Sequence, residues 1–189
     1  MPAQRIDSTS QKRSRFVYLT ALLFLALFGS VAQAAQPRGI AGLVWGDSPQ
    51  AAEAKMRKMH FSDMEHAPFS QQQDGAVYIF RNGTAFGRYT HNALLLFHRN
   101  RLYSVLFDFG GDPESTFPEI LSLLEEQFGP PTGYGDKPQP QPEWQVDGTD
   151  VALSLRPAED RRFRFMREST LVLYAADLAT VRRMQRQGK

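Results

Sequence analysis

Short runs of β-branched and aromatic residues, separated by tight-turn signals, constrain the fold of this chain more than any other feature. They occupy residues 76–80, 84–89, 93–97 and 102–109, and recur at 144–146, 151–155, 162–166 and 170–174. Each run is too short for an independent helix and is bounded by polar or glycine-rich residues. Asn82-Gly83 and Asp147-Gly148 supply residue types that adopt the positive φ angles of two-residue hairpin turns. The pattern predicts antiparallel meanders, with one hairpin at Asn82-Gly83.

Two helices are predicted from their boundary residues. Ser48 and Pro49 have the side chains expected at the N-cap and first turn of a helix that ends near His60. The segment 116–119 (Thr-Phe-Pro-Glu) is a capping-box pattern at the start of a second helix. Gly129-Pro130 is expected to end this second helix.

The order of these segments predicts the fold class and the domain organisation. A last helix is expected at about 177–187, with its cations near the C-terminal end. The chain is therefore expected to form an α+β fold with helices packed on one face of an antiparallel sheet. The order suggests two similar helix-plus-meander halves and a C-terminal helix. The Pro/Gly-rich segment 129–142 is expected to be a surface loop within one domain, because neither half alone holds enough apolar residues.

The N-terminus has the pattern of a cleavable signal peptide. Basic residues that end at Arg15 precede the apolar run 16–28, and the small side chains of Ala32 and Ala34 suit a signal peptidase that cuts after Ala34. An uncleaved anchor is the minor alternative, because the run is shorter than the ~20 residues of a spanning helix. Residues 1–34 are therefore predicted to be removed, leaving a domain of residues 35–189 in the periplasm or secreted.

The absence of cysteine limits how the exported domain is stabilised. The chain contains no cysteine, which excludes a disulfide framework and lipid attachment to a cleavage-site thiol. About 150 residues are enough to build one hydrophobic core. The domain is therefore expected to rely on that core alone.

Charge is distributed unevenly along the exported part. Residues 35–155 carry nine basic and 15 acidic side chains, whereas residues 156–189 carry nine basic and four acidic ones. Such a basic segment attracts anions, so an envelope protein or an acidic envelope polymer, including lipid headgroups, is the expected partner. Export argues against nucleic acid. The alternative is a solvated surface paired with the domain's own acids. The candidate binding residues are Arg162, Arg164, Arg182 and Arg183.

The sheet strands are unusually aromatic. If helices cover only one face of the sheet, some of these rings are expected on the open face, where they would form a binding surface. Tyr103 and Phe107 are the candidates in this group. Packing in the hydrophobic core is the alternative for most of the rings.

Catalytic and metal-binding patterns are weak throughout the chain. None of the four histidines has the spacing of a defined zinc motif, and Ser48 is explained by its capping position. Asp108 and Asp112 bracket a Gly-Gly connection and are expected to be solvated loop residues. We therefore predict no catalytic residue, metal or cofactor. The competing hypothesis is an envelope hydrolase or metal-dependent enzyme that uses His60, His66 and nearby acids.

The chain resembles a family of exported two-layer modules of the beta-lactamase-inhibitor-like type. The likeness is carried by Gly42-Leu-Val-Trp-Gly-Asp-Ser48, Leu96-Phe97 with Leu102-Tyr-Ser-Val105, Gln127-Phe-Gly-Pro-Pro131, Trp144 and Val151-Ala-Leu153. The resemblance implies non-catalytic binding by helices packed on an antiparallel sheet, and it transfers no functional residue. A departure is the absence of a lipid-attachment cysteine. The expected function is thus a non-catalytic binding module of the cell envelope, with a purely structural envelope protein as a further alternative.

Overall fold

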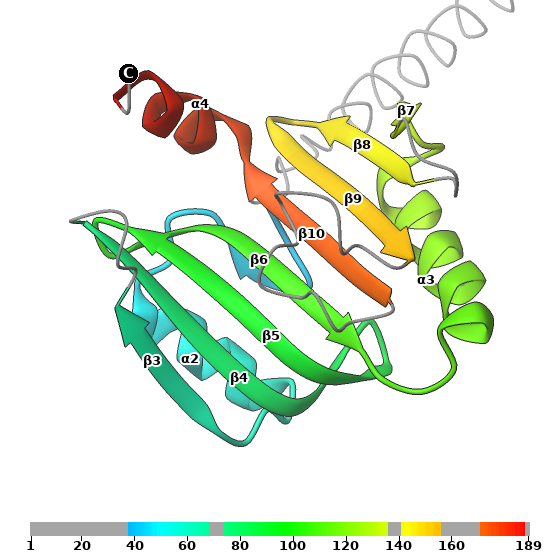
Figure 1. Cartoon of the computed structure of the whole chain (residues 1–189), viewed down its shortest axis with the longest axis horizontal. Helices are drawn as coiled ribbons and strands as arrows, with labels where there is room; N and C mark the ends of the chain where they lie inside the picture. The colour runs from blue at the N-terminus through cyan, green and yellow to red at the C-terminus, as the bar shows by residue number, and fades with distance from the viewer. Residues whose placement is uncertain (1–37, 69–73, 136–140, 156–170, 188–189) are drawn as a thin grey trace, which may run out of the picture. The chain divides into compact units, whose positions relative to one another are not determined.

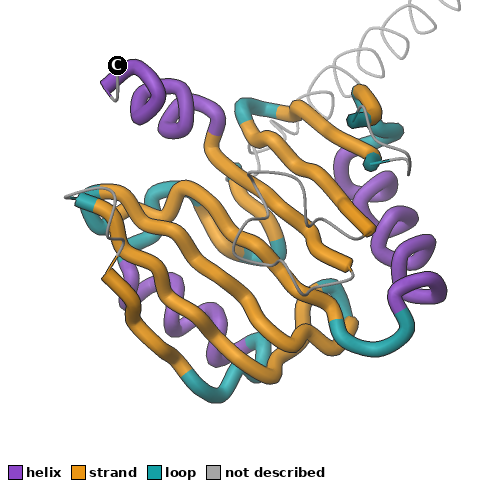
Figure 2. Tube along the Cα trace, viewed as in Figure 1, coloured by secondary structure: helices purple, strands orange, loops and turns teal. Residues whose placement is uncertain are grey.

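A single eight-stranded antiparallel sheet organises the compact unit of residues 37–189 (Figure 1, Figure 2). The computed structural model describes residues 38–68, 74–135, 141–155 and 171–187. The strand order is β3-β4-β5-β6-β10-β9-β8-β7. The strands are β3 (Met64–Pro68), β4 (Gly75–Ala85), β5 (Arg88–His98), β6 (Arg101–Phe109), β7 (Gly133–Tyr134), β8 (Pro142–Val146), β9 (Thr149–Leu155) and β10 (Leu171–Asp177), beside a small hairpin of β1 (Gly39–Ile40) and β2 (Leu43–Val44).

The fold has two halves, each made of a helix followed by an antiparallel meander. Helix α2 (Pro49–Lys58) precedes the meander β3 to β6, and helix α3 (Pro113–Phe128) precedes β7 to β10. Within each half the strands neighbour one another in chain order, and the last strands, β6 and β10, pair antiparallel at the centre. Helix α4 (Leu178–Gln187) follows β10. The predicted α+β fold with an antiparallel sheet is confirmed.

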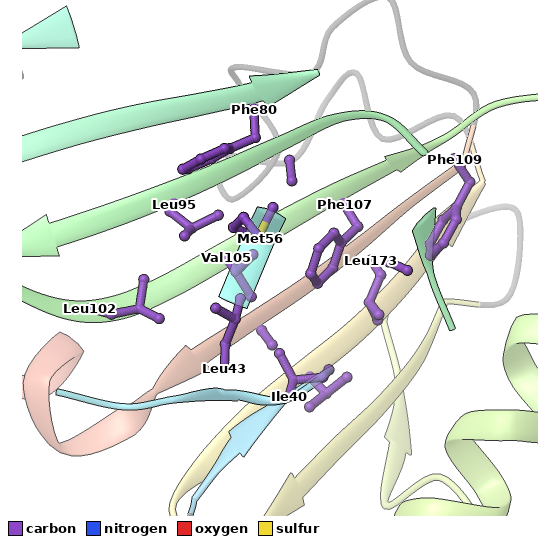
Figure 3. Packing of buried hydrophobic residues seen from close by; sticks show 14 of the residues in the cluster. Ile40, Leu43, Met56, Phe80, Leu95, Leu102, Val105, Phe107, Phe109 and Leu173 are labelled. Atoms are coloured by element: carbon purple, nitrogen blue, oxygen red, sulfur yellow. The ribbon is translucent and has the colours of Figure 1, made fainter. Parts of the chain in front are cut away.

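The main core lies between one face of the sheet and the two helices α2 and α3. Met56 of α2 and Leu124 of α3 are fully buried in one cluster with the inward-facing side chains of β4, β5, β6, β9 and β10. Figure 3 shows Met56 and Leu43 close to Val105, with Phe107 beside them. The β1–β2 hairpin therefore completes the layer that the helices form.

The predicted start of the second helix is wrong by several residues. Helix α3 begins at Pro113, and Asp112 caps it by accepting hydrogen bonds from the backbone of Glu114 at 3.2 Å and Ser115 at 3.3 Å. Thr116 lies inside the helix and donates its hydroxyl to the Asp112 carbonyl at 2.8 Å. Asp followed by Pro provides both a cap and a first-turn residue, so it takes precedence over the later Thr-x-x-Glu pattern. Asp112 is thus exposed, as predicted, and in addition caps α3.

The first hairpin turn also differs from its predicted position. Strand β4 continues through Asn82 and Gly83, and the chain reverses at Phe86 and Gly87, whose φ angles are 54° and 71°. Gly83 is instead required for packing, because a Cβ atom there would lie 2.2 Å from Cγ of Phe61. The glycine allows the Phe61 ring to lie directly on the strand backbone.

Other boundaries agree with the sequence. Ser48 caps α2 by accepting the Ala51 N–H at 3.2 Å, and the turn at residues 147–148 has positive φ at both positions. The segment 129–142, which was expected to be a surface loop, contains the short strand β7. The predicted signal peptide, residues 1–34, and the predicted strand 162–166 lie outside the described residues.

Replacing Gly83 by alanine tests the close approach of Phe61. The added methyl group displaces the ring, and overpacking of this kind costs about 1–3 kcal/mol of unfolding free energy. Urea denaturation measures the loss. Gly133→Ala is the matched control, because an added Cβ there meets nothing within 4 Å and the position has no positive φ. Equal stability of the two variants would contradict the packing role of Gly83.

Candidate functional site

Helix α4 begins directly at the end of a central strand. The Asp177 carboxylate accepts hydrogen bonds from the backbone N–H of Thr180 at 3.1 Å and from its hydroxyl at 2.6 Å. The Leu178 N–H donates to the carbonyl of Gly148 at 2.9 Å, in the turn between β8 and β9. Figure 1 shows the helix extending from the end of β10. The start of α4 is therefore fixed both by a side-chain cap and by a neighbouring turn.

The remainder of α4 is an exposed basic surface. Arg182, Arg183 and Arg186 are exposed, whereas Leu178, Val181 and Met184 are half-buried. Successive residues are rotated by about 100° around a helix, which places the three arginines within an arc of about 100°. We call these three arginines the basic face of α4. No helix of the described residues is long and apolar enough to cross a membrane.

The basic face lacks the carboxylate partners that several other cations of the described residues have. On α2, Lys55 pairs with Asp47 at 2.6 Å and Arg57 pairs with Glu53 at 2.7 Å. In the part of the chain that the structure describes, none of the three α4 arginines pairs with a carboxylate. The sequence after Asp177 also contains no acidic residue. Among the described residues, no carboxylate therefore neutralises the positive charge of α4.

The predicted arginine cluster is tested only in part. Arg182 and Arg183 lie together on α4, with Arg186 one turn after Arg182, as the helical spacing of these cations predicts. Arg162 and Arg164 lie outside the described residues, so their place in a binding surface stays a prediction. The predicted start of the last helix at about residue 177 agrees with α4, and the structure adds that Asp177 is its cap.

The prediction that Phe107 lies on an open, aromatic binding face is wrong. Its side chain is fully buried in the main core, on the face that α2 and α3 cover. Phe80, Phe97 and Phe109 lie in the same core. Tyr103 is on the opposite face, where it is half-buried beside a second apolar cluster. Most aromatic residues therefore serve packing rather than recognition.

The second face of the sheet combines that apolar cluster with a polar row. The cluster consists of Val77, Leu94, Leu96, Leu106, Ala152 and Val172, all buried. Beside it, Arg81 pairs with Glu65 at 3.0 Å and donates to Asn92 at 3.3 Å. The Asn92 amide donates to Asp108 at 3.2 Å, so the row crosses four strands. Asp108 is 8% exposed, which corrects its prediction as a solvated loop residue.

The histidines do not converge. The Met59 carbonyl, next to His60, accepts the Thr84 N–H, whereas His66 pairs in register with Tyr78. The six residues of β4 between these two points span about 20 Å. Ligands of one metal ion lie within about 2.1 Å of it, so His60 and His66 cannot share a metal in this arrangement. Within the described residues no group of three potential ligands comes together.

Removing the Asp177 cap tests how the basic face is positioned. Asp177→Ala removes the acceptor for two hydrogen bonds, and loss of a cap costs about 1 kcal/mol, so amide exchange in residues 178–187 should accelerate about fivefold. Hydrogen exchange followed by mass spectrometry measures this change. Asp177→Asn retains a side-chain acceptor and should keep most of the protection. Unchanged exchange in the alanine variant would show that the cap does not hold the helix.

The chain matches no protein-family model, no curated protein and no solved structure. The similarity to beta-lactamase-inhibitor-like modules therefore stays a prediction. A functional assignment depends on the arrangement of the described residues alone.

Proposed function

We propose that this protein is an exported, non-catalytic binding module of the cell envelope that contacts its partner through the basic face of α4. The observation that carries the proposal is the set of three exposed arginines without a carboxylate partner among the described residues. Such a cluster attracts anionic groups over a distance set by the ionic strength.

The structural setting of α4 supports this role. A binding surface needs a firm base, and α4 continues from β10, which is paired on both sides within the sheet. The helix itself has no buried residue, so its side chains remain at the surface of the domain. The separation of His60 and His66 gives no support to a hydrolase built on that pair.

Charge reversal on α4 tests the proposed function. Crosslinking in intact cells, followed by mass spectrometry, should identify a specific envelope partner of the wild-type protein. Replacing Arg182, Arg183 and Arg186 by Glu should abolish that crosslink, because attraction becomes repulsion. Circular dichroism and thermal unfolding check that the variant remains folded. A partner captured equally by both proteins would contradict the role of α4.

A further inference from the structure

We propose that the basic face of α4 binds the headgroup surface of an anionic lipid bilayer, with the arginine side chains contacting lipid phosphates. This inference rests on the proposed function, because it names the partner class for the same surface. It depends on three features of α4: the arrangement of its charges, the absence of exposed large apolar side chains on it, and the partial burial of its apolar side.

The arrangement of charge suits an extended anionic surface. Arg182 and Arg186 are one turn apart along the helix, and Arg183 lies about 100° around from Arg182. The three arginines therefore lie on one side of a short helix, where the Arg183 guanidinium also donates to the Thr180 hydroxyl at 3.2 Å. A guanidinium group donates paired hydrogen bonds to phosphate oxygens, and a lipid surface offers many phosphates at once.

The composition of the exposed side favours lipid headgroups over a folded protein partner. Protein interfaces depend on a few large apolar or aromatic anchors. The exposed side chains of α4 other than the arginines are Ala179, Gln185 and Gln187, none of which is such an anchor. The exposed large apolar residues of the described chain are Met64, Tyr89, Leu123 and Tyr134, all outside α4. Attraction to anionic headgroups comes from cations, at about 1 kcal/mol for each Lys or Arg near the surface.

Three half-buried apolar residues of α4 indicate how deeply this helix would enter a bilayer. Leu178, Val181 and Met184 are partly covered in the folded unit rather than exposed. The helix therefore presents charge instead of an apolar surface that would enter the acyl region. Contact at the headgroup level is peripheral, reversible and weakened by salt.

Vesicle flotation measures this binding. The chain from Ala35 onward is used, because it contains the whole compact unit of residues 37–189 and omits the apolar run 16–28. It should bind vesicles of mixed phosphatidylcholine and phosphatidylglycerol, and it should not bind vesicles of phosphatidylcholine alone. Raising NaCl from about 0.1 M to about 0.5 M should release it.

Two sets of variants locate the contact on α4. Each basic residue near an anionic surface contributes about fivefold to binding, so removing three lowers the partition coefficient about a hundredfold. The Arg→Gln replacements at 182, 183 and 186 keep helix-forming side chains, and the Arg→Glu replacements reverse the charge. The control changes three exposed cations elsewhere to Glu, with the same change in net charge: Lys58 and Arg101, which have no ion pair among the described residues, and Arg99, which pairs with Asp74 at 3.0 Å.

A fluorescent probe gives an independent readout. Because the chain has no cysteine, Gln187→Cys provides a unique labelling position on α4, and Glu126→Cys provides one on α3. Headgroup-labelled quencher lipids should quench the α4 probe and leave the α3 probe unchanged. Equal quenching at both positions would overturn the assignment to α4.

The outcomes separate this inference from the proposed function. Loss of binding in the α4 variants, with binding retained in the control, supports the lipid surface. No binding to anionic vesicles, or equal loss in the α4 variants and the control, overturns it. A further outcome is that the protein does not bind vesicles and still crosslinks in cells to an identified protein. If that crosslink is lost on α4 charge reversal, the proposed function stands with a protein partner. If both experiments fail, both proposals fail.

Discussion

The antiparallel pairing of β6 with β10 is the contact on which the rest of the structure depends. It joins the two meanders, through register pairs such as Val105 with Ala175 and Phe107 with Leu173. The Ser104 hydroxyl adds a hydrogen bond to the Ala175 carbonyl at 3.0 Å. These partners are about seventy residues apart, so forming them closes a long loop, and burial of apolar surface must offset that entropy. Both strands are buried over nearly their whole length, and this burial of apolar surface offsets the entropy of closing the loop.

The same central pairing determines where the basic helix emerges. Because β10 lies between β6 and β9, its C-terminal end is held from both sides before α4 begins. Asp177 pairs in register with Thr149, whose hydroxyl accepts a hydrogen bond from the Trp45 indole at 2.9 Å. The chain preceding α2 thus reinforces the base of α4. An exposed helix on a fixed base can present charge without contributing to the core.

Several local features were predictable because their physics is local. Ser48 with Pro49, the turn at Asp147-Gly148 and the end of α3 at Gly129 each follow from the conformational preferences of one or two residues. The errors arose where two local signals competed or where a distant ring intervened. Asp112 displaced Thr116 as the cap of α3, and Phe61 converted Gly83 from a turn residue into a packing position.

Some features of the candidate site follow from the sequence, and others depend on the tertiary structure. The sequence by itself determined that the C-terminal segment is a basic helix, since helical periodicity and the absence of acids after Asp177 are properties of the chain alone. Only the tertiary structure decided that Phe107 is core and that Asp108 is the buried end of a polar row, because burial depends on which strands become neighbours. It also decided that the α4 arginines are exposed without a carboxylate partner among the described residues. Pairing of that kind is set by distances across the fold, which periodicity along one helix does not contain.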